Sequence, residues 1–254
     1  MTGPGIFLIL IAASVVGCAT VPEPDPLSML PPVEGALVRG DALYQSPRSS
    51  NRVQQAALHY EAAAQQPEQA AEALWKAARA YAWLGQYGAD ASQREGAIAR
   101  GINLARRAID ADPQQAPAHY YLAVALGLFS DLRAAMNHLP EMAEAAQRAA
   151  ELDPAIDGGG PYRLLGALYG KAPEPPISLG DEERGLDYLH QAVKLAPNNP
   201  ENYFRLAELL AAMGDDAEAK RHLQQALFLQ DDDADPTETL AWQTQARKLW
   251  DKLK

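Results

Sequence analysis

The chain has 254 residues, of which 48% are hydrophobic and 7% aromatic, and 22 basic against 33 acidic side chains give a formal net charge of -11. This apolar content excludes a disordered chain. The acidic balance argues against nucleic acid as a partner, because a phosphate backbone attracts basic surfaces. The single cysteine excludes an internal disulfide framework and a cysteine-rich zinc site.

The N-terminus carries an apolar run of eleven residues from Ile6 to Val16. The run is too short to span a bilayer and has the length of a signal-peptide core. It leads into Val15-Val16-Gly17-Cys18, which resembles the lipobox of bacterial lipoproteins, whose cysteine receives diacylglycerol and a further acyl chain. We therefore expect a signal peptide over residues 1–17 and a lipid anchor on Cys18. The alternatives are an ordinary cleaved signal and an incidental cysteine.

A proline-rich segment follows the cysteine. Residues 19–33 contain five prolines, which favour an extended polyproline-like chain and predict a tether over residues 18–33. Ala19, in place of aspartate, resembles lipoproteins sorted to the outer membrane. The expected location is the outer membrane of a bacterial envelope, facing the periplasm.

Residues 34–254 show a repeated pattern in which an alanine is followed five residues later by proline. The alanines are Ala62, Ala108, Ala149 and Ala192, and a fifth copy, Ala226, has Asp231 in place of the proline; their spacings are 46, 41, 43 and 34 residues. Upstream, Tyr162, Leu165, Gly166 and Tyr169 match the opening of a tetratricopeptide repeat, and the same spacing recurs from Leu74, His119 and Tyr203. The periodicity predicts pairs of helices.

These helix pairs need neighbours. Small residues at the glycine and alanine positions let the two helices of a repeat approach closely, and proline ends the second helix. One hairpin cannot bury its apolar face alone, so the repeats must stack. The predicted fold is all-α, a right-handed superhelical solenoid of tetratricopeptide-like repeats, with a capping helix from Pro236 to the end of the chain.

The first three complete repeats are longer than the last. We expect the excess to form insertions between the two helices of each repeat, at Gly85–Gly96, around Ser130–Pro140 and at Gly170–Gly180. In a solenoid such insertions emerge along one edge. They form either a rim or ordinary surface loops.

Three segments resemble the T-component proteins of TRAP-type transporters: Gly158–Tyr169 with the residues up to Asp181, Ala73–Tyr81 and Ala118–Ala123. The resemblance covers about residues 36–229. It implies a periplasm-facing repeat lipoprotein that associates with itself. It also implies pairing with a periplasmic solute-binding protein, to hand over a hydrophobic, carboxylate-bearing solute.

The pattern of polar residues does not favour catalysis. The five histidines are scattered without metal-ligand spacing, and no nucleophile, base and acid fall into a recognisable arrangement. The aspartates from Asp231 to Asp235 lack the glycine and glutamate of a calcium loop, so we expect a solvated acidic loop there. We expect no enzyme activity, no metal site and no cofactor.

The concave face of the solenoid is the candidate binding surface. Helical spacing from each repeat opening places large apolar groups and two arginines there: Trp75, Arg79, Trp83, Tyr120, Val124, Leu128, Arg163 and Phe204. Apolar surface favours a hydrophobic body, and arginine can hold a carboxylate through paired hydrogen bonds. The alternative is that the aromatic groups pack against the C-terminal helix and the arginines pair with acids of the chain.

Two functions fit this arrangement. The leading hypothesis is a lipid-anchored binding protein that holds a hydrophobic or carboxylate-bearing small molecule and docks a solute-binding protein for TRAP-type transport. The second is an envelope scaffold that uses its surfaces to organise other proteins in outer-membrane assembly or secretion.

Overall fold

The computed structural model describes residues 30–88, 90–133, 136–229 and 234–254. The expected signal peptide, Cys18 and most of the expected tether lie outside these residues. Within them the chain forms α-helices and two short 3₁₀ turns, at Pro67–Gln69 and Met136–His138, and no strand. None of these helices combines the length and hydropathy that crossing a bilayer would require.

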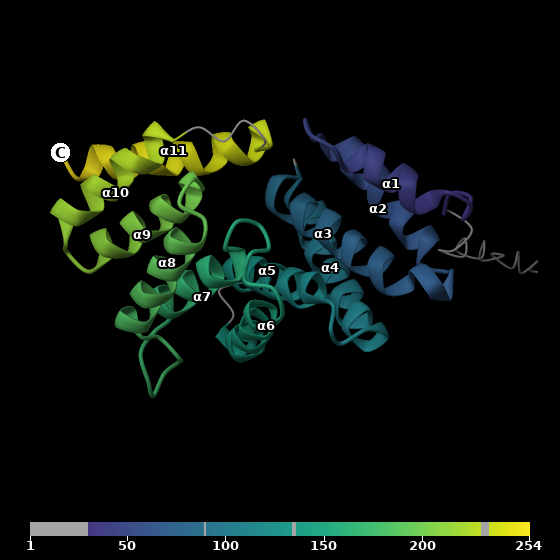
Figure 1. The fold of residues 1–254 in the computed structure, drawn as a ribbon, viewed down its shortest axis with the longest axis horizontal. Helices are drawn as coiled ribbons and strands as arrows, with labels where there is room; N and C mark the ends of the chain where they lie inside the picture. The colour runs from purple at the N-terminus through teal and green to yellow at the C-terminus, as the bar shows by residue number, and fades with distance from the viewer. Residues whose placement is uncertain (1–29, 89, 134–135, 230–233) are drawn as a thin grey trace, which may run out of the picture.

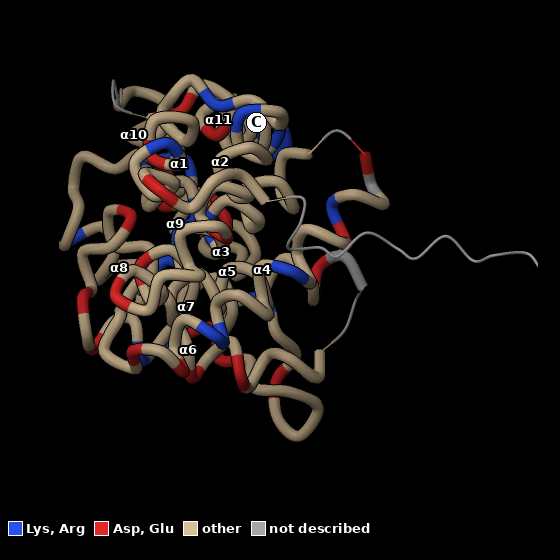
Figure 2. Tube along the Cα trace, turned by 90° about the vertical axis from the view of Figure 1, so that its right-hand side faces the viewer, with Lys and Arg blue, Asp and Glu red and all other residues tan. Residues whose placement is uncertain are grey.

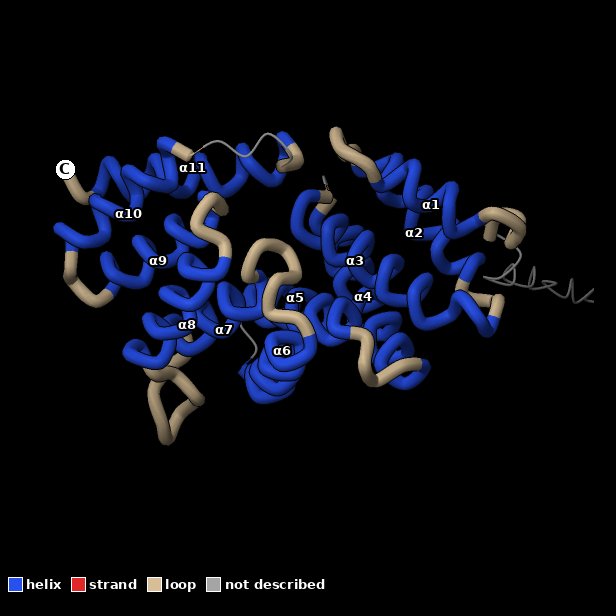
Figure 3. The backbone as a smooth tube through the Cα atoms, viewed as in Figure 1, coloured by secondary structure: helices blue, strands red, loops and turns tan. Residues whose placement is uncertain are grey.

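The helices pair in chain order and stack side by side into a curved row (Figure 1 and Figure 3). They are α1 (Ala36–Tyr44), α2 (Ser50–Ala63), α3 (Ala70–Tyr87), α4 (Ala91–Ala111), α5 (Ala116–Arg133), α6 (Leu139–Leu152), α7 (Gly160–Lys171), α8 (Glu182–Leu195), α9 (Pro200–Ala212), α10 (Asp216–Phe228) and α11 (Pro236–Lys252). The predicted all-α solenoid of helix-turn-helix repeats is confirmed. The N-terminal α1 and α2 form a complete helical hairpin.

The helix starts follow from local chemistry. Asp181, Asp215 and Asp235 stand just before α8, α10 and α11, where each side chain accepts a backbone N–H of the first turn. Proline occupies the first turn of α9 and α11, where its missing N–H costs nothing.

The core of each repeat consists mainly of alanine and leucine. Ala77, Ala78 and Ala123 are completely buried, and glycines bring some helices closer still. A Cβ on Gly166 of α7 would lie 2.4 Å from Leu189 Cγ of α8, which is inside van der Waals contact. The small residues at the repeat positions therefore set the close packing of paired helices.

Two of the three predicted insertions are mainly helical. The predicted loop at Gly85–Gly96 is wrong, because α3 continues to Tyr87 and α4 begins at Ala91. The extra residues therefore lengthen these two helices. Around Ser130–Pro140, α5 continues to Arg133. The third stretch is a loop between α7 and α8, which is tied down where Gly180 N–H donates to Pro173 O and Asp181 N–H donates to Tyr169 O.

Helix α11 runs back along the last repeat after the row has ended (Figure 1). Its Trp242 and Ala246 are buried in one cluster with Phe204 and Leu223. The first turn of α11 points toward the loop between α1 and α2, so the two ends of the row approach each other (Figure 1). Basic and acidic residues are interspersed along the chain when the molecule is viewed from its N-terminal side (Figure 2).

Candidate ligand-binding cavity and its clasp

The curved row encloses a cavity of about 770 Å³. Its wall is formed by α3, α5 and α7, with contributions from the end of α1, from Glu201 and Arg205 of α9, and from Glu238 of α11. This volume lies in the range of about 300–1,000 Å³ that is typical of small-molecule sites. The concave face of this solenoid therefore forms a partly open chamber of the size of a small-molecule site.

Six of the eight predicted binding residues line this cavity: Arg79, Trp83, Tyr120, Val124, Leu128 and Arg163. Their spacing explains this, because residues four apart on a helix share one face. Arg79 and Trp83 share the inner face of α3, and Tyr120, Val124 and Leu128 share that of α5.

The other two predicted residues do not line the cavity. Trp75 stacks behind the wall on Tyr121, with ring centroids 6.1 Å apart and planes 3° apart. Phe204 is 1% exposed and packs against Trp242 of α11, with ring centroids 6.4 Å apart. Phe204 is therefore a core residue of the C-terminal repeat, because the last helix covers the face that would otherwise be concave.

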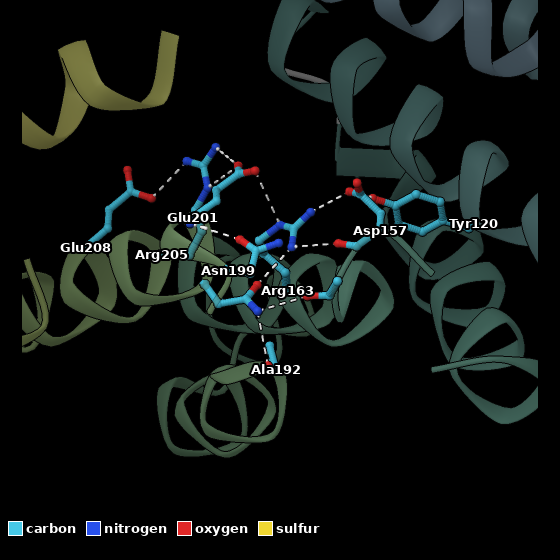
Figure 4. A network of polar contacts seen from close by, with 10 residues as sticks. Tyr120, Asp157, Arg163, Ala192, Asn199, Glu201, Arg205 and Glu208 are labelled. Atoms are coloured by element: carbon cyan, nitrogen blue, oxygen red, sulfur yellow. Dashed lines mark hydrogen bonds and ion pairs between the residues drawn. The ribbon is translucent and has the colours of Figure 1, made fainter. Parts of the chain in front are cut away.

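Arg163 is held by groups of its own chain (Figure 4). Its Nη1 donates to Asn202 Oδ1 at 2.8 Å and to Asp157 O at 3.2 Å, and its Nη2 forms an ion pair with Asp157. Nε lies 3.7 Å from Glu201 Oε2. Burial lowers the pKa of Arg163, but Glu201 and Asp157 outweigh burial and raise it above its usual range. Arg163 therefore fits the alternative expectation, in which an arginine of the concave face pairs with acids of its own chain.

Tyr120 belongs to the same network. Its hydroxyl donates to Asp157 Oδ2 at 2.6 Å, and burial followed by the charge of Asp157 raises its pKa well above the usual value. Gly160 makes this approach possible, because a Cβ there would lie 2.5 Å from the Tyr120 hydroxyl oxygen. Gly160, just before Pro161, thus lets α7 approach α5 closely.

Asn202 and the acids of α9 complete the network (Figure 4). Asn202 is fully buried, and its Nδ2 donates to Gly158 O at 2.9 Å and to Ala192 O at 3.0 Å. Arg205 bonds to Glu201 at 3.0 Å and to Glu208 at 3.3 Å. One side of the chamber is therefore polar but internally satisfied.

Arg79 differs from Arg163. Its guanidinium carbon lies 4.0 Å from the ring centroid of Tyr44 and 5.3 Å from that of Trp75, distances at which a cation is attracted to an aromatic face. Its Nη2 donates to the Tyr60 hydroxyl at 3.4 Å. In the described ranges, no carboxylate lies within ion-pair distance of Arg79.

A clasp closes the chamber where the two ends of the row meet; it consists of Ser46 and Arg48 of the α1–α2 loop and Asp235 and Glu238 of α11. Asp235 Oδ2 accepts from the Arg48 backbone N–H at 2.8 Å and from Ser46 Oγ at 3.1 Å. The Arg48 guanidinium donates to Glu238 Oε1 at 2.5 Å. These contacts bridge more than 180 sequence positions, so the row is joined into a ring.

The clasp was not predicted from the sequence. Asp235 belonged to a stretch expected to be a solvated acidic loop, yet its side chain is fully buried. The Asp-Pro pair at 235–236 identifies a helix start. No local signal relates it to Arg48.

The described residues contain no group of three or more histidine, cysteine, aspartate or glutamate side chains that could hold a metal ion. Among the described residues, the chamber provides a cavity, an aromatic surface and one arginine, Arg79, without an acidic partner.

Comparisons with known proteins agree with the fold. The family described as Regulator of microtubule dynamics protein 1-3 matches residues 36–157, and the Tetratricopeptide repeat family matches residues 177–242. No curated protein sequence matches the chain.

Two solved structures are similar to this one over most of its length. One is a thermophilic TPR protein of Thermus thermophilus, with a TM-score of 0.61 and 20% identity over 85% of this chain and 98% of its own. The other is the MamA protein, with a TM-score of 0.51 and 18% identity over 77% of this chain and 90% of its own. The fold is therefore that of tetratricopeptide-repeat proteins, and residues 177–242 match the family model of these repeats. Tetratricopeptide repeats suggest a scaffold for protein–protein interaction.

Proposed function

We propose that this chain is a lipid-anchored adaptor of the bacterial envelope, which holds an amphipathic small molecule in its chamber and docks a protein partner on its outer surface. The observation that carries the proposal is the cavity of about 770 Å³ on the concave face. A peptide partner of an open solenoid would lie along the concave face, but here the clasp joins the two ends in front of that face. The chamber therefore suits a small-molecule ligand, and the outer surface of the solenoid remains available to protein partners.

The lining of the chamber supports an amphipathic guest. One side is apolar, formed by Val124, Leu128, Leu164, Leu168 and Met142. Burial of apolar surface contributes about 25 cal/mol per Å². The polar side is occupied by bonds within the chain, so only a few groups remain for recognition.

The envelope location and the transport role rest on sequence. The lipobox-like residues before Cys18 support a lipid anchor at the outer membrane, facing the periplasm. The resemblance to T-components supports a solute-binding protein as the partner in TRAP-type transport, together with self-association.

The second candidate is a scaffold in outer-membrane assembly or secretion that needs no guest. The repeat fold itself favours this reading, because a curved row of helices offers a large surface to other proteins. The two candidates differ in whether the chamber is used.

The test is to purify the full chain, extract it with organic solvent, and identify retained molecules by mass spectrometry. Ala167 lines the chamber on α7, so Ala167→Trp should project a large ring into it and obstruct binding, whereas Ala99→Trp adds the same bulk on the exposed face of α4. We expect an amphipathic molecule with the wild type and with Ala99→Trp, and its loss with Ala167→Trp. Equal recovery from all three would contradict the chamber as the binding site and favour the scaffold.

A further inference from the structure

Five basic side chains line the chamber, and four of them are neutralised by acids of the chain. The pairs are Arg48 with Glu238, Arg163 with Asp157, Arg205 with Glu201, and Lys171 with Glu208. The fifth is Arg79, which has no such pair in the part of the chain that the structure describes. Arg79 is therefore the one basic side chain of the described lining without an ion pair, and the lining also contains the acid Asp131.

The aromatic neighbours of Arg79 do not supply the missing negative charge. Burial raises the pKa of Tyr44 to about 12, so this phenol is neutral at physiological pH. Burial also raises the pKa of Tyr60 and Tyr121 above the usual value. The rings hold the guanidinium in place by cation–π contact, but its charge remains.

The wall around Arg79 also contains donors without partners. In the described ranges, four buried side-chain polar atoms have no hydrogen-bond partner in the protein, and three belong to chamber residues: Arg79 Nε, Trp83 Nε1 and Ser130 Oγ. Native proteins satisfy nearly all such groups, and each exception costs about 1–3 kcal/mol. Several unpaired polar atoms in one chamber are typical of a site that recognises a hydrogen-bond acceptor.

The apolar surface continues from this point. Trp83 follows Arg79 by one helical turn on α3, and Val124 and Leu128 lie on the facing side of α5. A molecule with an acid group at Arg79 can thus lay a hydrophobic body on the same wall.

We infer that Arg79 binds the acid group of an amphipathic carboxylic acid, whose apolar body occupies the side of the chamber formed by Trp83, Val124 and Leu128. This inference rests on the proposed function, since it names the chemical class of the guest and the residue that selects it. Arg163, which has the same side chain, is excluded from this role by its bonds to Asp157 and Asn202.

The test is calorimetric titration of the full chain with decanoate and with decanol, two probes of equal chain length that differ in charge. We expect the wild type to bind decanoate more tightly than decanol by about 10- to 100-fold, as the strength of a hydrogen bond to a charged group implies. Arg79→Gln should remove this preference and leave decanol binding unchanged. Arg106→Gln is the matched control, because Arg106 pairs with Glu141 away from the chamber.

Decanol binding reports whether Arg79→Gln is folded. If that variant does not fold, the wild type decides alone through a third probe, decylammonium, which should bind more weakly than decanol. Equal affinity of wild type for all three probes overturns the role of Arg79 but leaves the chamber as an apolar site. Absence of binding by any probe overturns both the inference and the proposed chamber. Binding of decanoate that Arg79→Gln retains would place the acid elsewhere.

Discussion

Replacing Asp235 by alanine should break the clasp that joins the two ends of the repeat row. Its buried carboxylate accepts three hydrogen bonds: from Thr237 N–H at 3.0 Å, Arg48 N–H at 2.8 Å and Ser46 Oγ at 3.1 Å. The first is a helix cap, worth about 1 kcal/mol. The two bonds to the α1–α2 loop should contribute about another 2–4 kcal/mol, since hydrogen bonds to charged groups are the stronger class.

Asp215 provides the matched control. It caps α10 by accepting the Glu218 N–H at 3.1 Å and makes no bond to a distant part of the described chain. Asp215→Ala should therefore cost the cap alone, about 1 kcal/mol. Calorimetry should show a melting temperature lower by roughly 5–15 °C for Asp235→Ala than for Asp215→Ala, at about 2–4 °C per kcal/mol for a chain of this size. Hydrogen exchange should show faster exchange of the Arg48 amide in Asp235→Ala only. Equal melting temperatures and an unchanged Arg48 amide would refute the clasp.

Three further predictions concern packing, buried polarity and pH. Gly160→Ala should destabilise the fold by about 1–3 kcal/mol, because its Cβ meets Tyr120. Gly96→Ala has no atom within 4 Å of its Cβ and should stabilise the fold by about 0.5–1 kcal/mol. Urea denaturation measures both changes. Asn202→Leu should lower the free energy of unfolding by about 3–5 kcal/mol in the same assay, because it removes one acceptor of the buried Arg163 guanidinium and the donor to the carbonyls of Gly158 and Ala192; a cost below about 1 kcal/mol would contradict this. Burial raises the pKa of Asp235, but its hydrogen bonds outweigh burial and lower it, so the stability that this carboxylate adds is complete above about pH 4 and lost as pH falls through the folded pKa. The melting-temperature gap between wild type and Asp235→Ala should close below about pH 4, and a gap that persists there would contradict the sign.

The repeat architecture was predictable because its cause is local. The alanine, glycine and proline positions recur along the chain, and each sets a close approach or a helix end within its own repeat. The same logic placed Arg79 and Trp83 on one face of α3, and Tyr120, Val124 and Leu128 on one face of α5.

The errors arise where a distant element decides the outcome. Phe204 has the correct spacing for the concave face, but α11 covers it, and nothing near Phe204 in the sequence signals that contact. Arg163 and Arg79 look equivalent as residues of two repeats. Only the fold shows that Arg163 donates a hydrogen bond to Asn202 and that aromatic rings surround Arg79.

The predicted loop lengths were wrong for a different reason. The extra residues around Gly85–Gly96 were expected to leave the helices, yet they extend α3 and α4, and the stretch contains no proline to stop either helix. At Gly170–Gly180, where three prolines interrupt the helix, the same reasoning placed a loop correctly.

The most direct test of a closed ring with an acid-binding chamber is a crystal structure of the full chain with a fatty acid that carries bromine at its methyl end. We expect an anomalous bromine peak among Leu128, Met142 and Leu168. We also expect the carboxylate to lie at Arg79 and the Asp235–Arg48 contact to be intact. A bromine peak confined to the outer surface, or a row of helices whose ends lie apart, would contradict it.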